Sequence, residues 1–151
     1  MRALLLAALL PSPLLAQGAD VTASDPAMVA AGIQAYGHKA RIETADDGSP
    51  MISARGGDIN YVVYFYGCDA GANCLDLQFL AAFDVTEPLT ADFVNGWNRD
   101  WVMGKAFVDE TGDPTITFVV AGSPSMPGPY FQSVMEVWTT AVDSFLEDIN
   151  W

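Results

Sequence analysis

The side chains that most readily do chemistry in this sequence are two cysteines and one histidine. Cys68 and Cys74 are separated by five residues rich in glycine, alanine, aspartate and asparagine, and His38 is the only histidine among 151 residues. In an oxidising compartment, two cysteines at this spacing are placed to close a small loop, so we predict a structural disulfide. A redox-active pair is the alternative, but neither the spacing nor the surroundings resemble Cys-x-x-Cys at the start of a helix.

The same residues do not complete a metal centre or a nucleophilic catalytic set. Two cysteines and His38 cannot supply the four ligands of a structural zinc site, and the acidic stretch 109–114 lacks the spacing of a calcium-binding EF-hand. A Ser-His or Cys-His pair would require a long-range meeting with His38 that the pattern does not support. We therefore predict no catalytic residue, no metal and no organic cofactor. The enzymatic alternative is a periplasmic hydrolase that uses carboxylates such as Asp76 and Asp84.

The N-terminus has the features of a secretory signal peptide. Arg2 precedes an apolar run over residues 3–10, and Ala16 follows as the most plausible cleavage position. The run is too short to span a bilayer, and the two prolines that follow it would break a membrane helix. We expect a signal peptide over residues 1–16, a flexible mature N-terminus over 17–23 and one folded domain over 24–151, in a periplasmic or secreted protein without stable membrane insertion.

The charge of the mature chain limits its partners. Removal of Arg2 leaves five of the six basic side chains against 19 acidic ones, a net charge of −14. A nucleic acid would be repelled, and the five cations do not form a run that could bind phosphates. Acidity keeps the protein soluble and favours a basic or apolar partner. The cations in question are Lys39, Arg41, Arg55, Arg99 and Lys105.

Two apolar segments joined by the cysteine loop predict a central β-hairpin. Residues 75–83 alternate with a period of two, which is typical of a strand with one buried face. Residues 61–67 are apolar at nearly every position, so both faces of this strand should be covered, by helices or by a partner. Turn residues predict further strands at each side of 46–49 and of 109–114. These strands are expected over 39–43, 50–54, 102–108 and 115–121.

Three helices are expected, over 24–36, 89–101 and 130–149. Asp25 and Thr90 are suitable N-caps for the first two. The third has apolar residues at three- and four-residue spacing, so it must lie across the sheet or against another subunit. The predicted fold class is α+β, an antiparallel sheet of about six strands with three flanking helices in the order α-β-β-β-β-α-β-β-α.

This order of elements, together with several short motifs, resembles the YbjN-domain family. The motifs are Asn95-Gly-Trp-Asn-Arg99, Gly104-Lys-Ala-Phe-Val-Asp109, Trp138, and the paired-cysteine segment with Gln78-Phe79 and Ala82-Phe83. The family is described as bacterial sensory transduction regulators and is similar in fold to type III secretion chaperones. Those chaperones bind partner polypeptides across an antiparallel sheet with flanking helices, and this fold relation is an analogy.

The resemblance implies roles for the matched residues but no catalytic ones. Four aromatic residues are expected in the structural core, namely Phe79, Phe83, Trp97 and Trp138. Asn98, Arg99 and Asp100 are candidate partner-binding residues. Alternatively, the amide of Asn98 could bond a neighbouring strand end or cap its helix.

The function expected from the resemblance is non-catalytic. The protein would be a sensory transduction regulator or a chaperone-like module that binds an envelope or exported polypeptide in the periplasm. A homodimer is an alternative assembly, since a surface of this kind can pair with itself.

Overall fold

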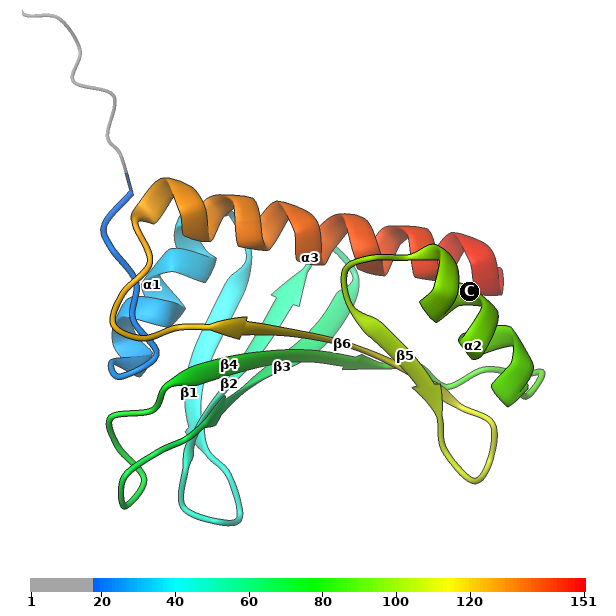
Figure 1. The fold of residues 1–151 in the computed structure, drawn as a ribbon, viewed down its shortest axis with the longest axis horizontal. Coiled ribbons are helices and arrows are strands. Elements are labelled where there is room, and N and C mark those ends of the chain that lie inside the picture. The colour runs from blue at the N-terminus through cyan, green and yellow to red at the C-terminus, as the bar shows by residue number, and fades with distance from the viewer. Residues whose placement is uncertain (1–17) are drawn as a thin grey trace, which may run out of the picture.

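The computed structural model describes residues 18–151, so the predicted signal peptide over 1–16 lies outside the described part. The described chain forms one antiparallel six-stranded sheet and three helices (Figure 1), which confirms the α+β prediction and its order of elements. The elements are α1 (Pro26–Ala35), β1 (Lys39–Thr44), β2 (Pro50–Gly56), β3 (Ile59–Tyr66), β4 (Asp76–Ala82), α2 (Ala91–Asp100), β5 (Lys105–Val108), β6 (Pro114–Ala121) and α3 (Gly128–Ile149).

The strand order is β1-β2-β3-β4-β6-β5, so the first four strands form a meander and β6 adds to β4. As a consequence β1 and β5 are the two edge strands. β3, the strand with the most continuous apolar sequence, lies inside the sheet between β2 and β4. Local patterns predict the meander because each hairpin joins neighbours in the sequence, whereas the pairing of β4 with β6 spans the whole of α2 and β5.

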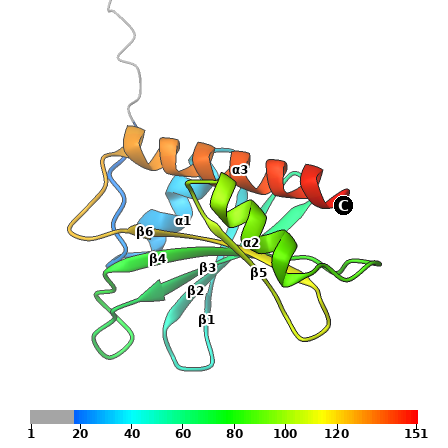
Figure 2. The ribbon, with the colours of Figure 1, turned by 45° about the vertical axis from the view of Figure 1, so that its right-hand side comes forward.

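The helices gather on one side of the sheet (Figures 1 and 2). α3 passes over the sheet, α1 lies near its first turns, and α2 lies near its C-terminal end. Gly32 permits the close approach of α1 to α3, because a Cβ at this position would lie 2.7 Å from a ring carbon of Phe131. Asp25 and Thr90 cap α1 and α2 through their side-chain oxygens, as expected.

Aromatic rings fill the space between the helices and the sheet. Trp138 on α3 has its ring centroid 5.6 Å from those of Tyr61 and Phe79, and it is 1% exposed. Trp97 on α2 meets Phe145 of α3 at 5.1 Å in an edge-to-face arrangement. The four residues expected in the core, Phe79, Phe83, Trp97 and Trp138, are all buried.

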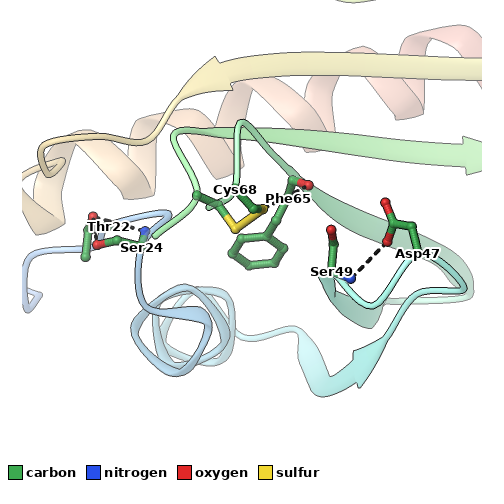
Figure 3. Close-up of a disulfide and its surroundings, with 7 residues drawn as sticks. Thr22, Ser24, Asp47, Ser49, Phe65 and Cys68 are labelled. Atoms are coloured by element: carbon green, nitrogen blue, oxygen red, sulfur yellow. Dashed lines mark hydrogen bonds between the residues drawn. A yellow bond between two sulfur atoms is a disulfide. The ribbon is translucent and has the colours of Figure 1, made fainter. Parts of the chain in front are cut away.

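The predicted bridge between Cys68 and Cys74 is present in the loop that joins β3 to β4 (Figure 3). Cys74 is buried against the core, and the backbone N–H of Leu75 donates to the carbonyl of Tyr66 directly beside the loop. The bridge therefore closes the connection between two interior strands of the sheet.

The N-terminal segment differs from its prediction. A flexible stretch was expected over 17–23, but the described part of it is bound to the loop before α3. The backbone of Val21 pairs with that of Met126, and the N–H of Ala23 donates to the carbonyl of Gly122. The side chains of Val21 and Ala23 are buried. Short apolar residues between polar ones do not mark such pairing in the sequence, because their partners lie about a hundred positions away.

Candidate functional site: the uncovered face of the sheet

One face of the sheet carries no helix among residues 18–151 (Figures 1 and 2). We call it the open face and define it by the strand side chains on the side away from the helices; two of these, Thr115 and Thr117 on β6, are themselves buried. Strand register arranges these side chains in rows that cross the sheet. The rows are Lys39, Arg55 and Asn60, then Arg41, Ser53, Val62, Leu80, Thr117 and Lys105, then Glu43, Met51, Tyr64, Gln78 and Val119, then Tyr66, Asp76 and Ala121, with Phe107 beside Thr115.

The open face keeps apolar side chains that nothing in the described chain covers. The apolar run of β3 predicts cover on both faces, but helices cover only the side of Tyr61, Val63 and Phe65. On the other side Val62 and Tyr64 are half-buried, and Tyr66 is 49% exposed. The prediction that helices or a partner cover both faces is thus met on one face only. These uncovered apolar side chains make this side of the sheet the candidate binding surface.

Four of the five cations in residues 18–151 lie on the open face. Only Arg99 lies elsewhere, on α2. The six strands contain two acidic residues, Glu43 and Asp76, so the open face has a formal charge of +2. The rest of the described chain holds one cation and 17 carboxylates, a formal charge of −16. The charge of this acidic protein is therefore strongly segregated.

The second row of the open face has a symmetric composition. From β1 to β5 it reads Arg41, Ser53, Val62, Leu80, Thr117 and Lys105. A cation lies at each end of the row. Next to each cation, towards the centre of the sheet, is a hydroxyl-bearing side chain, and two aliphatic side chains occupy the centre. Since adjacent strands lie about 4.8 Å apart, the Cα atoms of the two edge cations are separated by roughly 24 Å along the sheet.

A groove of about 540 Å³ lies on the β1 to β4 half of this face. Three cations line it, Lys39, Arg41 and Arg55, and Val62 and Leu80 form part of its apolar floor. This volume lies within the range of natural ligand sites, although the groove is shallow and open. Its chemistry suits a ligand that offers anionic groups beside an apolar body.

Two of the three cations of the groove make local ion pairs, and Arg55 also donates from Nε to the carbonyl of Gly57 at 3.0 Å. Arg41 pairs with Glu43 on the same strand, and the Nη2 atom of Arg55 lies 3.0 Å from Oδ1 of Asp58 in the following turn. Within residues 18–151, neither Lys39 nor Lys105 makes an ion pair. Exposed pairs of this kind contribute about 0–1 kcal/mol. An external carboxylate can therefore replace them at little cost.

A second candidate is a smaller cavity of about 240 Å³ beside His38, with Tyr61, Thr139 and Asp143 among its lining residues. His38 Nδ1 lies 2.9 Å from the hydroxyl of Tyr61. Burial lowers the pKa of His38, and the carboxylate of Asp143 partly opposes this. Burial likewise raises the pKa of Tyr61. Both groups are neutral near pH 7, so we interpret the pair as a hydrogen-bonded seam at the edge of the core.

Comparison with known protein families identifies the family of this chain. The sequence pattern of the YbjN family, described as "Putative bacterial sensory transduction regulator", matches residues 25–151. The chain belongs to the YbjN family. No curated protein and no solved structure gave a match. The matched range includes every helix and strand of the structure, so the open face is part of the YbjN domain itself.

The candidate partner-binding residues of this YbjN domain lie at the end of α2, away from the open face. The amide of Asn98 donates to the carbonyl of Ala106 at 2.9 Å and accepts from the N–H of the same residue at 2.7 Å. This is the strand contact that was the alternative interpretation of Asn98. Arg99 and Asp100 are exposed and pair with each other at 3.0 Å. The structure does not bring these three side chains together with the groove.

The carboxylates of the enzymatic alternative are also separated. Asp76 begins β4 and Asp84 lies beyond its end. Eight residues of extended chain place them roughly 26 Å apart, whereas paired catalytic carboxylates lie about 5–10 Å apart. Within 18–151, no three His, Cys, Asp or Glu side chains are grouped so that they could hold a metal ion. No helix in this range is both long and apolar enough to cross a bilayer.

Proposed function

We propose that this YbjN protein is a non-catalytic binding protein of the bacterial envelope, which takes a polypeptide partner on its open face. The observation that carries the proposal is the uncovered apolar centre of the sheet. Val62, Tyr64 and Leu80 lie on the interior strands β3 and β4, and no described element packs over them. A partner that covers them would remove apolar surface from water at about 25 cal/mol per Å².

The location in the envelope is supported by two independent features. The N-terminal sequence has the charge and apolar run of an export signal. The Cys68 to Cys74 bridge suits an oxidising compartment, since disulfides are rare in the reducing cytosol. A regulator in this location would sense or carry a signal by binding and releasing its partner.

Site-specific photo-cross-linking tests the proposal in cells. A photoreactive phenylalanine analogue replaces Tyr64 on the open face or, as the control, Tyr130 on α3, which is 54% exposed. We expect a discrete polypeptide adduct from position 64 and none from position 130. Because Tyr130 is the more exposed of the two, random encounters would label the control at least as strongly. Equal labelling at both positions, or no adduct at position 64, would overturn the proposal.

A further inference from the structure

We propose that the occupant of the open face is an acidic polypeptide segment with an apolar centre, seated in the groove lined by Lys39, Arg41 and Arg55. This inference rests on the proposed function and specifies the chemistry of the partner. The overall acidity of the chain suggests a basic partner, but the distribution of charge reverses this expectation at the open face. Four cations against two carboxylates lie on the strands of this face, and six of the remaining 17 carboxylates lie in the connections 45–49, 67–75 and 109–113 that border it.

The arrangement of the groove favours carboxylates. Lys39 and Arg55 are directly opposed on β1 and β2, and Arg41 lies two residues along β1 on the same face. Like charges directly opposite each other on neighbouring strands destabilise a sheet. A bound carboxylate between them relieves this repulsion, and a guanidinium can bind it with two parallel hydrogen bonds. Of the local partners, the Asp58 side chain is 96% exposed and that of Glu43 is 27% exposed, and ion pairs at the surface contribute little.

The second row of the open face determines where the bound segment would need apolar and acidic residues. Val62 and Leu80 supply an apolar centre, and Arg41 and Lys105 stand at the two edges, roughly 24 Å apart. A segment that follows this row has apolar residues in the middle and carboxylates at both ends. This distance corresponds to about seven residues of extended chain or about 16 residues of helix.

The loops around the open face favour a narrow polypeptide segment over a broad membrane surface as the occupant of the groove. The connections 45–49, 67–75 and 109–113 project on the open side of the sheet (Figures 1 and 2). They carry carboxylates, among them Asp47, Asp69 and Glu110. A membrane of anionic lipids would meet these loops before it reached the groove. A polypeptide segment that runs across the strands passes between them.

The same charges argue against a second copy as the occupant. A two-fold dimer through the open face would place two copies of the same strand surface, each with a formal charge of +2, against one another. Packing the acidic outer side of α3 on the open face of another copy would leave a free site at each end. Such a heterologous contact produces open chains unless the rotation between copies closes a ring.

Selection from a random peptide library tests the inference on the purified, disulfide-bonded protein. We expect the selected peptides to be enriched in aspartate and glutamate on both sides of a leucine-, valine- or isoleucine-rich centre. The double variant Arg41→Glu/Arg55→Glu should bind these peptides at least about tenfold more weakly. Arg99→Glu, which makes the same change of sign on α2, should bind them like the wild type. Raising the salt from about 0.05 M to about 0.5 M should weaken the wild-type interaction.

The outcomes separate this inference from the proposed function. Enrichment of basic or uncharged peptides, or equal losses in both variants, would overturn the inference and leave binding on the open face intact. Binding of vesicles of anionic phospholipid that the double variant abolishes, without selection of any peptide, would replace the polypeptide by a lipid surface. Absence of both selected peptides and the adduct at position 64 would overturn the inference and the proposed function together.

Discussion

The two faces of the sheet differ in whether other elements of the chain cover their apolar side chains. On the covered face Tyr61, Phe79 and Trp138 form one aromatic cluster, with ring centroids about 6 Å apart and their side chains buried. On the open face the neighbouring residues Val62 and Leu80 have no described element above them, and cations stand at the edges of their row. The covered face is packed within one chain, whereas the apolar centre of the open face has no covering element among the described residues.

This difference shows what alternation along a strand can and cannot indicate. A strand with one buried face reads apolar and polar in turn, but β3 is apolar on both sides. The second apolar side can be stabilised by another element of the chain or by a partner, and the sequence alone does not distinguish them. Adjacent residues that point to opposite faces should therefore differ in how much their substitution lowers the free energy of unfolding.

The largest effect is expected on the covered face. Phe79→Ala or Trp138→Ala should each lower the free energy of unfolding by about 3–5 kcal/mol, because each removes a buried aromatic ring and leaves a cavity. Urea unfolding followed by circular dichroism measures the change. A loss below about 1 kcal/mol would mean that the face is not a packed core.

Reduction of the bridge between Cys68 and Cys74 should have a smaller effect. Loop-closure entropy for so short a loop corresponds to about 2 kcal/mol, so the reduced domain should remain folded with a lower midpoint of denaturation. Alkylation before and after reduction verifies the state of the two thiols. Complete unfolding on reduction would show that the aromatic cluster does not hold β3 and β4 together.

Leu80→Ala provides the matched control for Phe79→Ala, since the two residues are adjacent on β4 and point to opposite faces. Because Leu80 is only partly buried, the substitution should lower the free energy of unfolding by about 1 kcal/mol or less. It should, however, weaken the adduct formed from position 64. A loss of stability as large as that of Phe79→Ala would show that both faces belong to the core.

The smallest effect concerns His38. Its pKa lies below the ordinary value of 6.5 because burial disfavours the charged ring. The unfolded chain therefore binds the proton more readily than the folded one, and stability should decrease as the pH falls below about 6.5, down to the folded pKa. His38→Gln should lack this part of the pH dependence. If the stability difference between the two proteins is constant from pH 7 to about 5, the proposed neutral seam is wrong.

Local patterns were sufficient for the covered face and insufficient for the open one. The cysteine spacing predicted the bridge, the N-caps Asp25 and Thr90 predicted two helix starts, and periodicity predicted the burial of Trp138. All of these signals lie within one element or between neighbours in the sequence.

Local sequence patterns could not predict that the cations of the groove lie together. Lys39 and Arg41 are separated from Arg55 by a turn, and Lys105 follows Arg55 by 50 positions in the sequence. Only the register of the strands brings them to one face. The candidate residues Asn98 and Arg99 lie side by side in one short motif, but the amide of Asn98 is already hydrogen-bonded to the backbone of Ala106.

The most direct test of the central claim combines the photoreactive residue at position 64 with reversal of charge in the groove. The full-length chain carries the analogue at Tyr64 together with Arg41→Glu/Arg55→Glu or with Arg99→Glu as the control. We predict that the adduct is lost in the first protein and retained in the second, while urea unfolding shows both to be folded. An adduct of equal strength in the two proteins would contradict the account.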